Sequence, residues 1–193
     1  MDQQLFSRFN YLDLLILIVA WRIIYISRRN GLAIELFKLL GILTATYLAL
    51  HYYVTLALWG QKAFLGSLKL TVVELISFLT LALGGYLGFV ALRSIFYRFM
   101  KMEANPKINE IGGLILGFLR GFFVVGLLAY ILLISNVVYF NNSVKASYLG
   151  KRAVDISPAT YGWLWENLFS KFFPQEKFNS TVKQVKGEVI KNR

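Results

Sequence analysis

Cysteine is absent from this chain of 193 residues, and His51 is its only histidine. Without cysteine there can be no disulfide, thiolate metal site or cysteine nucleophile. A single histidine excludes multi-histidine metal motifs and leaves little material for a catalytic triad. The sequence also lacks G-x-S-x-G, H-E-x-x-H and a P-loop. We therefore expect no catalytic residue, no metal site and no cofactor, and we predict that the protein is not an enzyme.

Charged residues are scarce as well: they make up 16% of the chain, against 57% apolar residues. A soluble domain usually has about a quarter charged residues, because its surface needs polar cover. This composition predicts an integral membrane protein. The net charge of +11 is spread over loops and tail, which indicates contact with anionic lipid headgroups and not with nucleic acid. A second copy or another membrane protein is a further candidate partner, and no small-molecule substrate is indicated.

Four apolar stretches predict four transmembrane helices within a membrane domain of residues 1–140, at about residues 11–27, 36–59, 71–93 and 112–136. The first stretch is short. We interpret it as a retained helix and not a signal peptide, because Asp13 interrupts it and no small-residue cleavage site follows. Asn105-Pro106 precedes the fourth stretch and predicts a helix stop, since the residue before proline is pushed out of the helical region.

Residues 141–193 form a basic, aromatic-rich tail. Residues 161–173 are dense in Trp and Phe but too few to cross a bilayer. They predict an interfacial helix with tryptophan at headgroup depth. Residues 178–190 are either a second basic amphipathic helix or a frayed chain end. The predicted fold class is therefore all-α, with four transmembrane helices followed by an amphipathic helical tail.

The distribution of Lys and Arg predicts the orientation in the membrane. Eight lie in and beside the first and third loops, and six lie on the opposite side. Because positive residues gather on the cytoplasmic side, both termini are predicted to be outside.

Glycines recur every four residues in the last two predicted spans, at Gly84 and Gly88 and at Gly113, Gly117 and Gly121. This spacing forms a flat face that another helix backbone can approach closely. We favour packing of these two helices against each other within one subunit over homodimerisation.

Ionisable residues inside or beside the spans each need a partner, because a charge at the bilayer centre costs about 2.5–3.5 kcal/mol on insertion scales. For Arg120 two interpretations stay open: it reaches the interface, or it forms a buried pair with Asp13 or Glu35. Glu74 is expected at the interface. His51 lies beside two tyrosines, and we expect it in an aromatic belt.

These residues also form two ordered motifs. In the first, Asn10 and Asp13 open the first span, and Gly31 and Glu35 follow the turn after it. The second motif reads Asn109-x-x-x-Gly113-x-x-x-Gly117-x-x-Arg120-Gly121. In order, spacing and four-span context the chain resembles the colicin V production protein family over residues 10 to about 140. It departs from the family pattern before Gly31, where Ser27 and Asn30 replace the usual glycine and arginine.

The resemblance implies a non-enzymatic, multi-pass protein of the bacterial inner (cytoplasmic) membrane. Such a protein would support production or secretion of a peptide toxin (a bacteriocin), or envelope homeostasis. The alternative is a small transporter or channel subunit whose polar lining is Asp13, Glu35 and Arg120. Four spans can line a pore only as an oligomer. We favour the first interpretation.

Overall fold

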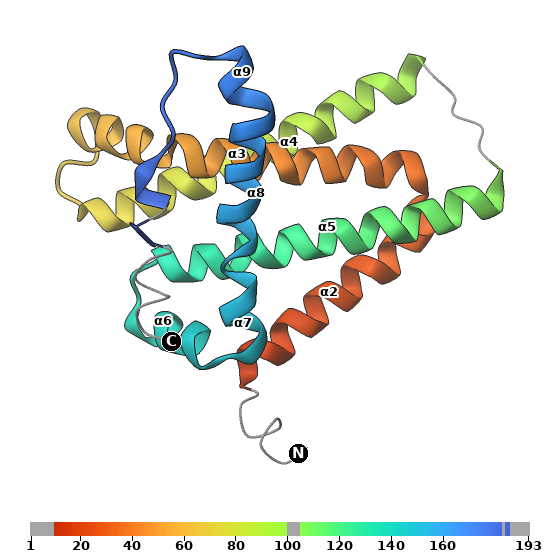
Figure 1. The fold of residues 1–193 in the computed structure, drawn as a ribbon, viewed down its shortest axis with the longest axis horizontal. Helices are drawn as coiled ribbons and strands as arrows, with labels where there is room; N and C mark the ends of the chain where they lie inside the picture. Colours follow the sequence, from red (N-terminus) through yellow and green to blue (C-terminus); the bar gives the residue numbers. More distant parts are fainter. Residues whose placement is uncertain (1–9, 100–104, 183, 186–193) are drawn as a thin grey trace.

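The computed structural model describes residues 10–99, 105–182 and 184–185. Within these residues the fold is all-α, as predicted, and contains no strand. Four long helices come first, and a series of short helical segments follows (Figure 1). The long helices are α2 (Tyr11–Asn30), α3 (Leu32–Ala63), α4 (Leu70–Phe99) and α5 (Pro106–Ile134). The short ones are α6 (Val138–Ala146), α7 (Tyr148–Ala153), α8 (Ile156–Leu164), a π-helical turn η1 (Trp165–Phe169) and α9 (Ser170–Phe172).

Three of the four long helices are long and apolar enough to cross a membrane: α3, the Leu70–Phe96 part of α4, and α5. The remaining predicted span, residues 11–27, is helical as part of α2 but is not long and apolar enough to be counted with the other three. Every stretch of 18 residues within α2 includes Asp13, Arg22 and Arg28, so at least three charges fall in each.

Helix α3 lies at the centre of the bundle. It packs along α4 on one side and against α5 on the other, and α2 packs along α5 (Figure 1). The prediction that α4 and α5 pack through their glycines is therefore wrong, because α3 lies between them. A Cβ atom at Gly84 or Gly88 would meet nothing within 4 Å, whereas one at Gly85 would lie 3.0 Å from the Cα of Ala45 in α3.

Asn105-Pro106 marks a helix boundary, but it begins a helix. Pro106 opens α5, where its missing N–H costs nothing. The Asn105 side chain accepts a hydrogen bond from the backbone N–H of Lys107 at 3.0 Å. The sequence therefore predicted the helix boundary at the right residues, but a helix begins there and does not end there.

The segments α7, α8, η1 and α9 follow one another as a column that crosses α3 and α5 (Figure 1). The helix predicted over residues 161–173 begins earlier, at Ile156, with Pro158 in its first turn. Tyr161 is fully buried against Tyr47, while Trp163 and Phe172 are exposed. Of the second predicted tail helix, residues 178–182 and 184–185 are described, and residues 183 and 186–190 lie outside the described part.

Candidate functional site

The centre of the candidate site is an ion pair between Arg120, midway along α5, and Glu35, in the first turn of α3. The Nε atom of Arg120 lies 2.8 Å from Oε2 of Glu35. Arg120 is 8% exposed and Glu35 is fully buried. Of the two interpretations of Arg120, the structure supports the buried pair, and it selects Glu35 as the partner. Nη2 of Arg120 also donates to the hydroxyl of Ser27 at 3.2 Å, so the arginine joins α5 to both α2 and α3.

The second oxygen of Glu35 is also engaged. Its Oε1 accepts hydrogen bonds from Nδ2 of Asn30 at 2.6 Å and from Nζ of Lys38 at 3.2 Å. Two cations and one amide therefore surround a single buried carboxylate, which is how a buried charge is tolerated. With both oxygens engaged, Glu35 is suited to holding helices together and not to exchanging protons with a substrate.

Gly31 and Asn109 form the corner between α2 and α3. Gly31 has φ 79°, a left-handed backbone conformation that glycine adopts without a steric penalty. A Cβ atom at this position would also lie only 2.4 Å from Nδ2 of Asn109. The Oδ1 atom of Asn109 accepts a hydrogen bond from the backbone N–H of Leu32 at 2.8 Å. Asn109 of α5 thus satisfies a free N–H at the start of α3.

The glycines of α5 face α2 at this corner. A Cβ atom at Gly113 would lie 2.8 Å from the carbonyl oxygen of Ser27 and 2.9 Å from the Cα of Gly31. At Gly117 it would lie 2.1 Å from the Cβ of Ser27. At Gly121 the nearest neighbour would be Ile23, at an ordinary 3.6 Å. The first two positions accept no side chain unless α2 moves, whereas Gly121 is not closely packed.

Six of the nine residues singled out from the sequence therefore meet at one place. With Ser27 they form what we call the Arg120 cluster: Ser27, Gly31, Glu35, Asn109, Gly113, Gly117 and Arg120. Ser27 bonds to Arg120, and Asn30 bonds to Glu35.

Asn10 and Asp13 lie at the opposite end of α2 and do not join this cluster. They form a capping box, in which the Asn10 side chain accepts backbone N–H bonds and Asp13 accepts one from the Asn10 N–H at 2.9 Å. Asp13 also accepts bonds from the Ser147 hydroxyl at 2.6 Å and the Leu149 N–H at 2.7 Å. One buried carboxylate thus caps α2 and the start of α7 together.

A comparison with protein families identifies the family of this chain. The sequence model described as colicin V production protein matches residues 12–158. The chain belongs to the colicin V production protein family. No curated protein and no solved structure matches it. Nearly all of the motif residues that suggested the family fall in the matched stretch, and there they join α2, α3, α5 and α7 by bonds and close contacts.

The sequence did not predict a third cluster of contacting residues, which lies where the column of α7, α8, η1 and α9 crosses α3. His51 is buried midway along α3 and stacks between Tyr47 and Trp165. Its Nδ1 lies 2.8 Å from the Tyr161 hydroxyl and its Nε2 lies 3.2 Å from Glu176. The prediction that His51 lies in an aromatic belt is therefore wrong. The one available signal was the four-residue spacing of Tyr47 and His51, which places them on the same helix face.

Asn179, farther along the tail, also contacts this third cluster. Its backbone N–H donates to the Tyr161 hydroxyl at 2.9 Å, and its side chain donates to the carbonyl of Leu50 at 2.7 Å. Burial raises the pKa of Tyr161 above the usual value, so its hydroxyl keeps its proton and can donate to His51. The described residues contain no group of three or more His, Cys, Asp or Glu placed to hold a metal ion.

Proposed function

We propose that this protein is a non-enzymatic component of the bacterial inner membrane that supports production or secretion of a peptide toxin, or integrity of the cell envelope. Membership of the colicin V production family supports a role in colicin V production in general. The observation that carries the proposal further is the Arg120 cluster. Its polar groups bond to one another across three helices, since Arg120 of α5 contacts both Glu35 of α3 and Ser27 of α2, as expected for a structural scaffold.

We also propose that α2 forms a fourth span. Its 20 residues are about 30 Å long, which matches a hydrocarbon core of about 30 Å. Asp13 lies at one end, Arg28 and Arg29 lie at the other, and its outward face carries exposed Leu14, Leu17, Ile18 and Trp21. Arg22 is exposed and can reach the interface with its long side chain. Four spans would place both termini on one side, outside by the positive-inside rule.

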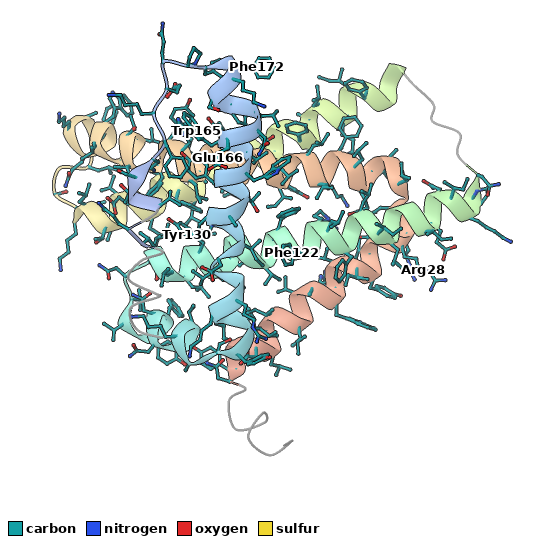
Figure 2. All side chains as sticks on the ribbon, viewed as in Figure 1. Arg28, Phe122, Tyr130, Trp165, Glu166 and Phe172 are labelled. Atoms are coloured by element: carbon teal, nitrogen blue, oxygen red, sulfur yellow. The ribbon has the colours of Figure 1, made fainter. Side chains whose placement is uncertain are left out.

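The exposed aromatic side of the tail is proposed to contact lipid. Figure 2 shows Trp165 and Glu166 partway along the column and Phe172 at its far end. Trp163, Phe172 and Phe173 are all exposed, and Lys171 lies among them. Aromatic side chains with a neighbouring cation suit a membrane surface that carries anionic headgroups.

The scaffold accounts for the polar groups better than a transport pore does. A pore needs charged groups that face water or the transported species. Asp13 and Glu35 are fully buried and are each bonded to several protein groups. Asp13 lies in the first turn of α2, whereas Glu35 lies in α3, beyond the opposite end of α2. The three groups expected to line a pore therefore do not share one path.

The proposed role is tested in a deletion strain that carries a colicin V secretion system. Secreted toxin and growth in detergent are measured with and without the wild-type gene. The proposal expects at least one of them to fall on deletion and to return with the wild-type gene. Unchanged secretion and unchanged detergent resistance in the deletion strain would reject it. Ion or solute flux through the purified protein in liposomes would favour the transporter instead.

A further inference from the structure

A pocket of about 200 Å³ with both polar and apolar walls lies at the opposite end of α5 from the α2–α3 corner. Its walls come from several parts of the chain: Thr71 and Glu74 of α4, Leu133 and Ile134 of α5, Lys145 of α6 and Val185 of the tail. None of these residues belongs to the Arg120 cluster. At this volume the pocket is smaller than those that hold drug-sized ligands, and it suits a small polar molecule or a headgroup.

The pocket lies at the level where candidate spans end. Thr71 and Glu74 are in the first turns of α4, and Leu133 and Ile134 are the last residues of α5. The ends of membrane-spanning helices lie near the lipid headgroups. Asn136, with φ 54°, turns the chain directly after α5 and allows α6 to return over the pocket. Lipid headgroups are therefore the most abundant ligands near this pocket.

The pocket contains one acid and one base that do not bond to each other. Glu74 and Lys145 both line it, yet no ion pair within 4.0 Å joins them, and neither makes a hydrogen bond to another described residue. Both are partly buried. An uncompensated charge in such a place is costly unless a ligand pairs with it. A ligand that carries both signs itself can pair with both groups.

We infer that this pocket binds a phosphoethanolamine group, with its ammonium on Glu74 and its phosphate on Lys145. An ammonium has three donors for a carboxylate, and a lysine is a compact point charge that binds phosphate. Leu133, Ile134 and Val185 supply an apolar wall along which the first carbons of a lipid can lie. The group can belong to phosphatidylethanolamine or to free phosphoethanolamine, and the inference is independent of the proposed role in toxin production.

The test is ligand binding to the purified full-length protein in detergent. Short-chain phosphatidylethanolamine, phosphatidylcholine, phosphatidylglycerol and free phosphoethanolamine are titrated separately, and bound ligand is counted by native mass spectrometry. Phosphatidylcholine keeps the charges but has no N–H donor, and phosphatidylglycerol has no ammonium. The expected result is preferential binding of phosphatidylethanolamine. Equal binding of all three lipids, or binding of none, overturns the inference.

Variants of Glu74 and Lys145 test whether these two side chains bind the charged groups of the ligand. Glu74→Gln and Lys145→Gln are each expected to weaken phosphatidylethanolamine binding by at least about tenfold, since a hydrogen bond to a charged group is worth about 1.5–3 kcal/mol. Glu166→Gln and Lys69→Gln remove the same charges at exposed positions outside the pocket and are expected to bind as the wild type does. Wild-type affinity in both pocket variants would overturn the assignment. Binding of free phosphoethanolamine as tight as that of the lipid identifies a soluble ligand, and its absence identifies the lipid.

Discussion

Gly117 of α5 lies directly against Ser27 of α2, so closely that a Cβ atom on Gly117 would be 2.1 Å from both Cβ and Oγ of Ser27. At this point the two helices leave room for a hydrogen atom only. The same serine accepts the hydrogen bond of Arg120, one turn along α5. Close backbone approach and the buried ion pair are thus parts of one contact.

Replacing the contacting glycines should destabilise the protein. Gly117→Ala and Gly113→Ala are expected to cost about 1–3 kcal/mol, because the added methyl group overpacks the contact. Gly84→Ala and Gly88→Ala are matched controls, since a Cβ there meets nothing within 4 Å. They should be neutral or slightly stabilising, given the higher helix propensity of alanine. Thermal unfolding in detergent measures all four, and equal effects at both pairs would contradict the packing.

The clash at Gly117 should be relieved from the other side. Ser27→Gly removes the atoms that a methyl group on residue 117 would meet. The double variant Gly117→Ala/Ser27→Gly is therefore expected to melt above Gly117→Ala, although it still lacks the bond to Arg120. If the stability loss of the double variant equals the sum of the two single losses, Ser27 is not what Gly117→Ala clashes with.

The ion pair should behave as a coupled unit. Glu35→Gln leaves the buried Arg120 without a carboxylate and is expected to cost about 3–5 kcal/mol. Arg120→Met leaves Glu35 paired with Lys38 and is expected to cost less. The double variant should cost clearly less than the sum, which a double-mutant cycle in detergent measures. The exposed pair of Arg28 and Glu110 is the control, and its removal should cost about 0–1 kcal/mol. Strict additivity at residues 35 and 120 would mean that they do not interact.

Asp13 should be needed for the order of α7. Asp13→Asn keeps the shape of the side chain but turns one acceptor into a donor opposite the Ser147 hydroxyl and the Leu149 N–H. The expected cost is about 1–3 kcal/mol, with faster trypsin cleavage at Lys151 and Arg152. Glu166→Gln, at an exposed position, should change neither the melting temperature nor the cleavage rate. Unchanged cleavage in Asp13→Asn would show that α7 is held by other contacts.

Tyr161 should hold the tail on α3. Tyr161→Phe removes the hydroxyl that lies between His51 and the Asn179 N–H, which leaves both buried groups without this partner. We expect a loss of about 1–3 kcal/mol and faster cleavage at Lys177. Tyr25→Phe removes an exposed hydroxyl that accepts a hydrogen bond from Arg29 and should have little effect. Equal cleavage rates in the two variants would place the tail's anchor elsewhere.

The sequence predicted the helical fold, a helix break at Asn105-Pro106, and most of the residues of the Arg120 cluster. These features depend on local chemistry: long apolar runs, a capping Asn-x-x-Asp, and glycines at helical spacing. It did not predict which helices meet. Glycine spacing indicates a flat face but not its partner, so Gly84 was paired with α5 although that face is open, and Gly113 proved to contact α2.

The tail was harder to predict because its aromatic residues suit two environments equally well. Trp165 and Trp163 lie two positions apart, yet one stacks on His51 and the other is exposed. Tryptophan enrichment alone does not distinguish a buried face from a lipid-facing one. Only the fold brings residue 176 to residue 51, a contact between distant parts of the chain that no local pattern encodes.

The central claim is that Arg120 acts by holding α2, α3 and α5 together. The most direct test is a deletion strain complemented with Arg120→Ala, in which membrane abundance by blot is measured with toxin secretion and detergent resistance. The account predicts that the variant is poorly folded, so that abundance and phenotype are lost together. Normal abundance with a lost phenotype would contradict it and give Arg120 a direct role. Full rescue at normal abundance would contradict it as well, since the arginine would then not be needed to hold the helices.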